Sequence, residues 1–86
     1  MKFIPLKTKI KYLNKIYLFQ GCLCLVAAVN TGMDNRYEIV CWNSLEDVWS
    51  FLGYSRINYF EWLEEKGIIF YDNTQENLTK LKLRTY

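Results

Sequence analysis

The chain has 86 residues, of which 51% are hydrophobic, 17% aromatic and 23% charged, with a net formal charge of +2. One domain over residues 1–86 is expected, because each half alone would lack a sufficient core, and the chain is too apolar and too aromatic for intrinsic disorder. It contains no histidine, the side chain most often used as an acid, base or metal ligand near pH 7, so the composition favours a protein that acts by binding.

The first predicted strand covers residues 7–15, where lysine alternates with apolar side chains. Five lysines also precede the apolar stretch Ile16–Val29, a pattern shared with secretory signal peptides. That stretch is too short to span a bilayer and is interrupted by Gln20 and Gly21. We therefore favour a chain that stays in the cytoplasm.

The second predicted strand is the run Cys22–Val29, which has no polar side. A short, continuous apolar run bounded by turn residues is typical of a strand covered on both faces. Residues 30–35 have the composition of a loop, and residues 36–42 return as a strand, which completes a hairpin.

The cysteines Cys22, Cys24 and Cys41 are an odd number for the disulfide framework of a small secreted domain. Cys22 and Cys24 share one face of the predicted strand, as a pair of metal ligands would. Zinc, however, normally takes four Cys or His ligands, and a fourth is missing. We predict reduced thiols packed in the core of a cytosolic protein, with no metal.

Two helices are predicted after residue 43. Ser44 with Asp47 three positions later is typical of a capped helix start, and Gly53 ends this first helix. Ser55 caps the second predicted helix, residues 56–66, which ends before a glycine. The apolar sides consist of Leu45, Val48, Trp49 and Leu52 on the first helix and of Ile57, Tyr59, Phe60 and Leu63 on the second.

The C-terminal residues are predicted to form a second hairpin. It comprises a strand over residues 68–71, a polar turn over 72–77 and a strand over 78–86, for which a helix is the competing prediction. The expected fold class is α+β: a small antiparallel sheet, made of the N-terminal strands and this hairpin, packed with a two-helix unit of helix-turn-helix type.

Charge is segregated along the chain. Residues 1–37 carry six basic residues against one acidic residue, residues 38–76 carry two against eight, and the last ten residues carry three basic residues. Such a chain either presents one basic and one acidic face, if its two ends meet in space, or merely solvates opposite sides.

Residues 44–68, from the first predicted helix through the glycine turn to the end of the second helix, resemble a helix-turn-helix unit. They are similar to the winged variety found in excisionase and MerR-type proteins, in which the closing hairpin is the wing, and to phage BRO-type DNA-binding domains. The resemblance implies a DNA-binding regulator or excisionase-like factor whose second helix enters the major groove. The residues that it places on bases and phosphates are Ser55, Arg56, Asn58, Tyr59, Lys80, Lys82 and Arg84.

Two features of this segment oppose DNA binding. Four positions before the turn glycine, the family motif has a small residue, because the two helices cross closely at that point. In this chain the position is occupied by Trp49. Residues 44–67 carry five acidic and two basic residues, and Glu61 and Glu65 lie on the face that would approach phosphate. The alternative is a plain helical hairpin packed on a sheet.

Trp62 lies on the polar side of the second predicted helix, about 130° from the centre of its apolar face at 100° per residue. An exposed tryptophan among polar residues is typical of a protein-binding hot spot, unless another element such as the N-terminal segment covers it. The predicted protein-binding residues are Trp62, Asn58, Glu61, Glu65 and Arg56.

The function expected from these patterns is binding without catalysis. The cysteines have no histidine as a base, no glycine-rich phosphate loop is present, and no cofactor is expected. In overall type the chain resembles small phage or mobile-element inhibitors, including anti-CRISPR proteins. This resemblance implies a stoichiometric inhibitor of a host protein of nucleic-acid metabolism or defence, acting in the host cytoplasm if the chain is phage-encoded. Duplex DNA and a second copy of the chain are the other partners considered.

Overall fold

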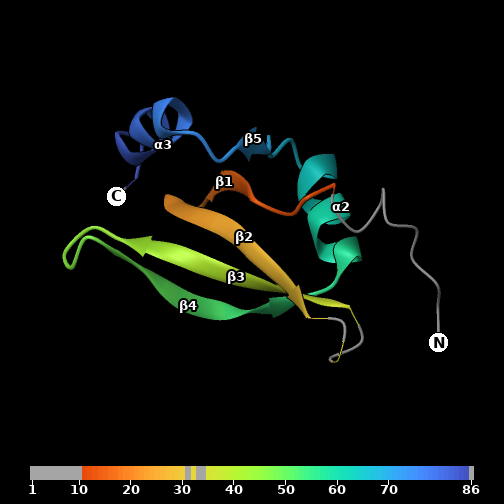
Figure 1. The fold of residues 1–86 in the computed structure, drawn as a ribbon. Coiled ribbons are helices and arrows are strands. Elements are labelled where there is room, and N and C mark those ends of the chain that lie inside the picture. Colours follow the sequence, from red (N-terminus) through yellow and green to blue (C-terminus); the bar gives the residue numbers. More distant parts are fainter. Residues whose placement is uncertain (1–10, 31, 33–34, 86) are drawn as a thin grey trace.

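The computed structural model describes residues 11–30, 32 and 35–85. In this part of the chain, a five-stranded antiparallel sheet with the strand order β4-β3-β2-β1-β5 carries two helices (Figure 1). The α+β class is therefore confirmed. The elements are β1 (Lys15–Phe19), β2 (Cys22–Asn30), β3 (Arg36–Asn43), β4 (Val48–Ser55), α2 (Ile57–Glu65), β5 (Tyr71–Asp72) and α3 (Gln75–Lys82).

The first strand lies later in the chain than predicted. Of the predicted range 7–15, residues 7–10 lie outside the described residues, and residues 11–14 form a turn in which Asn14 has a φ of 59°. β1 then pairs with β2 around Gln20 and Gly21, whose φ values of 53° and 79° make the tight reversal. The apolar stretch that resembles a signal peptide is therefore a β-hairpin.

The hairpin of β2 and β3 is confirmed, with Cys24 opposite Cys41 and Val26 opposite Ile39. Burial of β2 on both faces holds for its first half, where the adjacent residues Leu23 and Cys24 are both buried. Its second half is open to solvent at residues 27–28.

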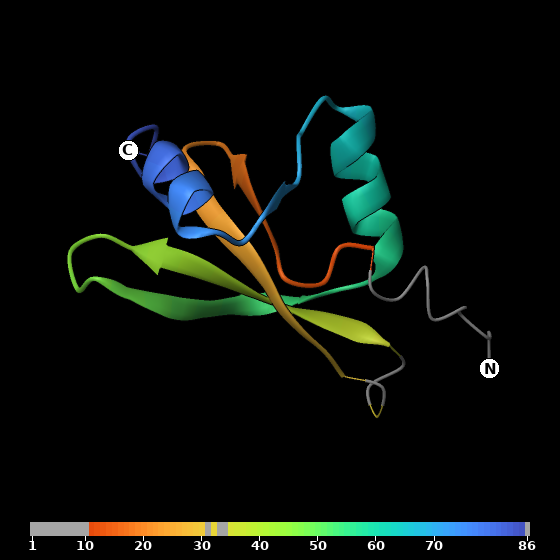
Figure 2. The same cartoon turned by 45° about the horizontal axis from the view of Figure 1, so that its top comes forward.

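The sheet separates two apolar clusters, because alternate residues of each strand point to opposite faces. The larger cluster lies under α2, and the smaller one lies under α3. In Figures 1 and 2, α2 and α3 stand apart with β5 between them. The α2 cluster consists of Tyr12, Tyr17, Cys24, Val26, Tyr37, Ile39, Phe60 and Leu63. The α3 cluster consists of Ile16, Leu23 and Leu81.

The predicted helix over residues 44–52 is wrong. Residues 44–47 form a turn, and β4 then pairs with β3 along its whole length. The side chain of Asn43 accepts hydrogen bonds from the backbone N–H groups of Leu45 (3.1 Å) and Glu46 (3.3 Å), and Asp47 has a φ of 58°. Asn43 therefore stabilises a hairpin turn at the place where Ser44 is predicted to cap a helix. The aromatic residues that follow form a strand because they can pair with β3.

The prediction of a C-terminal hairpin is also wrong, and the competing prediction of a helix is confirmed by α3. The only strand after α2 in the described residues is β5, which pairs with β1 through Tyr71 opposite Ile16. The side-chain oxygen of Thr74 accepts a hydrogen bond from the backbone N–H of Asn77 (3.2 Å), which caps the start of α3. The described residues therefore contain neither a two-helix unit before Gly67 nor a wing.

The second predicted helix exists as α2, with the predicted apolar side turned to the core. Phe60 and Leu63 are buried, and Ile57 and Tyr59 pack beside them. The predicted cap is wrong: Ser55 ends β4, and the N-cap position is occupied by Arg56, whose side chain makes no capping hydrogen bond. Closure by Gly67 is confirmed, since its φ of 91° is one that favours glycine.

Candidate functional site

The predicted protein-binding residues all lie on the outer side of α2. We define the α2 surface as these five exposed residues: Arg56, Asn58, Glu61, Trp62 and Glu65. The core-facing residues Phe60 and Leu63 fix the orientation of the helix, so the outer side chains are carried on a rigid support.

Trp62 is 44% exposed and is held by aromatic neighbours. Its ring stacks on Tyr59, with 6.2 Å between ring centroids, and meets Phe19 edge-on at 6.4 Å. The ammonium of Lys66 lies 5.7 Å from the indole centroid. An indole that is both half-exposed and supported on two sides has little conformational freedom to lose on binding, which is the property of a hot-spot residue.

Glu64 is the acid of α2 that faces the chain's own N-terminal segment. Its carboxylate accepts a hydrogen bond from the Tyr12 hydroxyl and lies 3.4 Å from the Lys11 ammonium. Burial, together with the hydrogen bond to Glu64, raises the pKa of Tyr12 above its ordinary value. Glu61 and Glu65 lie on the outer side, so the α2 surface combines a tryptophan with carboxylates.

The residues considered for DNA contact are not brought together. Ser55 ends β4, and Arg56, Asn58 and Tyr59 lie at the start of α2, where Tyr59 packs against the core. The predicted wing residues are on α3 and just after it, at the other side of β5 (Figure 2). The helix-turn-helix arrangement that would align the two groups is absent from the described residues.

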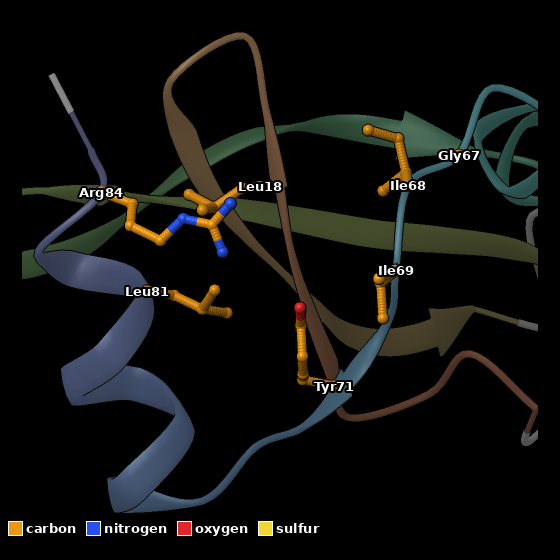
Figure 3. A pocket seen from close by; sticks show the side chains of 7 residues that line it. All are labelled: Leu18, Gly67, Ile68, Ile69, Tyr71, Leu81 and Arg84. Carbon is orange, nitrogen blue, oxygen red and sulfur yellow. The ribbon is translucent and has the colours of Figure 1, made fainter.

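Each predicted wing residue has a neighbour of its own within the fold. Lys80 pairs with Glu76 one helical turn away, at 3.2 Å. The ammonium of Lys82 lies 3.8 Å from the ring centroid of Trp42. Arg84 lines a cavity of about 150 Å³ between α3 and the segment 67–71, and its guanidinium extends over an apolar floor (Figure 3). The cavity has room for a single side chain, so we do not regard it as a substrate site.

The sequence analysis missed a second exposed surface, on the β3–β4 hairpin. We define the hairpin surface as Leu45, Val48, Phe51, Leu52 and Tyr54. In this order, the five residues are 97%, 45%, 59%, 59% and 41% exposed. Three of them had been assigned to the buried side of a helix. Turn residues at 43–47 between two stretches rich in aromatic and β-branched residues were the signal of a hairpin.

The cysteines differ in exposure, although all three lie on one face of β2 and β3. Cys24 is buried as predicted, and Cys41 is partly buried. Cys22 is exposed, so the prediction that it packs in the core is wrong. Burial raises the pKa of the Cys24 thiol to about 12 and also raises that of Cys41. Among the described residues, no group of three or more Cys, Asp or Glu side chains is arranged to hold a metal ion.

We expect iodoacetamide to alkylate Cys22 at least about tenfold faster than Cys24 or Cys41 in the folded protein at pH 8. The attacking species is the thiolate, which burial disfavours at the other two positions. Mass spectrometry of digested samples gives the rate at each site, and urea is expected to abolish the difference. Equal rates without denaturant would contradict the burial of Cys24.

Comparison with known proteins places no relative beside this fold. No protein-family model matches the chain, and no curated protein or solved structure matches it. Within the described residues, neither helix is long and apolar enough to cross a membrane.

Proposed function

We propose that the chain is a small, non-enzymatic protein that binds and inhibits a host protein stoichiometrically, in the manner of phage-type and anti-CRISPR-like inhibitors. The observation that carries the proposal is the half-exposed Trp62, supported by Tyr59 and Phe19 on the outer side of α2. Tryptophan is among the residues most enriched at the energetic centres of protein interfaces, where a rim of polar groups excludes water around it.

The acids around Trp62 favour one kind of partner. Glu61 and Glu65 are exposed on the α2 surface together with Trp62 and Arg56, and the Lys66 ammonium lies 5.7 Å from the indole centroid. Carboxylates so arranged complement a basic groove, and grooves of this kind are typical of proteins that handle nucleic acids. We therefore propose a nucleic-acid-binding host enzyme or defence protein as the target, with the α2 surface in its basic groove.

Replacing Trp62 by alanine is expected to weaken partner binding by at least about 1–2 kcal/mol, because truncation removes the central apolar contact. Captured partners are first identified from host lysate with the wild-type chain, and their affinity is then measured by calorimetry. Ile69→Ala is the matched control, since Ile69 is 61% exposed on the segment after α2. Equal affinities of the wild type and Trp62→Ala would remove Trp62 from the interface.

Nuclease treatment of the lysate separates protein binding from nucleic-acid binding. A protein partner that survives nuclease treatment supports the proposal. Capture that is lost with nuclease, together with a duplex affinity that falls steeply with salt, would instead support the DNA-binding alternative.

A further inference from the structure

The outer edge of β4 takes no part in the proposed function. β4 stands at one end of the strand order, so no strand of the described residues lies beside its outer N–H and C=O groups. Natural proteins usually protect such an edge with lysine, proline, a β-bulge or a covering segment, and of these β4 has a bulge at Leu52. β4 reads VWSFLGYS and contains neither a charged residue nor a proline.

The hairpin surface flanks this edge and is large for a small protein. Phe51 and Tyr54 lie on one face of β4, with 5.2 Å between their ring centroids. At about 200 Å² for a fully exposed large residue, the exposed parts of Phe51, Leu52 and Tyr54 amount to roughly 300 Å², and Val48 adds exposed apolar area on the opposite face of β4. A contiguous apolar patch of this size is one that often marks an interaction site on a small protein, and pairing of the strand edge itself would add main-chain contacts to it.

We infer that a second copy of this chain covers the edge, with β4 of one copy pairing antiparallel with β4 of the other about a two-fold axis. Charge complementarity favours this occupant. Asp47 directly precedes β4 and Arg56 directly follows it. Antiparallel pairing brings the Asp47 end of each strand beside the Arg56 end of the other, so the same favourable contact forms twice.

The bulge in β4 sets where the two-fold axis passes. The register with β3 shifts between Ile39 and Val40, which leaves Leu52 as the extra residue of β4. A residue midway between Asp47 and Arg56 would fall between Phe51 and Leu52. The two bulges therefore meet at the axis. The part of β4 before the bulge, residues 48–51, then pairs with the part after the bulge, residues 53–55, of the other copy. The two sheets join into one continuous antiparallel sheet.

Sedimentation equilibrium of the purified chain between about 1 μM and about 500 μM tests the inference. We expect a reversible dimer in the wild type and a dimer dissociation constant raised at least about tenfold by Leu52→Lys, because a lysine on the edge opposes strand pairing. Ile69→Lys, at a residue 61% exposed elsewhere, is the matched control and should leave dimerisation unchanged. A monomer over the whole range, or equal weakening by both lysines, overturns the inference.

A double-mutant cycle tests the ends of the paired strands. Asp47→Asn and Arg56→Gln are each expected to weaken the dimer, and the double variant is expected to be no weaker than the worse single variant, because both changes remove one contact. Asparagine suits position 47, since it tolerates the φ of 58°. Fully additive effects would overturn this pairing of the ends.

Amide hydrogen exchange of the wild type keeps the test independent of any variant. Protection in β4 is expected to rise with protein concentration, while protection in β5 stays constant; no concentration dependence in β4 overturns the inference. Trp62→Ala is expected to leave the dimer intact, because Trp62 lies on α2 and away from the hairpin surface. Loss of partner binding in Trp62→Ala and loss of the dimer in Leu52→Lys are therefore separate outcomes, whereas Arg56 belongs to both surfaces and does not distinguish them.

Discussion

Replacing Phe60 by alanine is expected to lower the free energy of unfolding by about 3–5 kcal/mol. Phe60 is fully buried and lies at the centre of the α2 cluster. Its ring centroid is 5.2 Å from that of Tyr12, 5.5 Å from that of Tyr37 and 6.0 Å from that of Phe70. Truncation therefore removes the contact through which α2, β3, the turn before β1 and the segment before β5 meet.

That loss is large beside the stability available. At roughly 0.05–0.15 kcal/mol per residue, a domain of this size has a free energy of unfolding of about 4–13 kcal/mol. Urea denaturation followed by far-UV circular dichroism measures the change. Phe51→Ala is the matched control, because the same ring is removed where it is 59% exposed, and a loss below about 1 kcal/mol is expected at low micromolar concentration. Equal losses at the two positions would contradict the docking of α2 on the sheet.

The sequence was informative where one pattern fitted one structure. The short apolar run of β2 is bounded by turn residues, the apolar side of α2 has helical spacing, and both elements exist within one or two residues of their predicted bounds. The rotation of about 100° per residue that directs Phe60 and Leu63 toward the core directs Trp62 toward solvent, and Trp62 is 44% exposed. A residue's side of a helix follows from the helix alone, so this part of the candidate site was predictable.

The hairpin surface was not predictable in the same way, because residues 44–52 fit two periods. Leu45, Val48 and Leu52 have helical spacing, whereas the aromatic and β-branched residues of the same segment favour a strand. Pairing with β3 decides between them, and that pairing is a tertiary contact. The helix prediction places Leu45, Val48 and Leu52 in the core, although all three are exposed on the hairpin surface.

The end of the chain shows the opposite error. Alternating lysine and leucine after residue 77 was interpreted as a strand, although Leu78 and Leu81 also have helical spacing. The cap at Thr74 and the pairing of Glu76 with Lys80 stabilise the helix locally. Interpreting residues 72–77 as a hairpin turn hid that cap, and with it the position of the three C-terminal basic residues.

An eight-residue helix is too short to persist alone in water, so α3 depends on its contact with the sheet. Leu81 is its one buried residue and packs with Ile16 and Leu23. Leu81→Ala is expected to lower the free energy of unfolding by about 2–3 kcal/mol, the low end for such a truncation, because the adjacent cavity lets the site relax. Urea denaturation measures the loss, and the helical signal in far-UV circular dichroism should fall before the sheet unfolds.

Leu83→Ala is the matched control, since Leu83 is 84% exposed just after α3 and its truncation is expected to cost less than about 0.5 kcal/mol. Tryptophan fluorescence reports release of α3 when Trp49 and Trp62 are first replaced by phenylalanine: Lys82 lies over Trp42, and Trp42 packs against the α3 cluster, so its emission is expected to shift toward that of an exposed indole when the helix leaves the sheet. A full loss of stability with unchanged emission would mean that Leu81 fills space without anchoring α3. A loss no larger than that of Leu83→Ala would instead show that the stability of the sheet and α2 does not depend on the packing of α3.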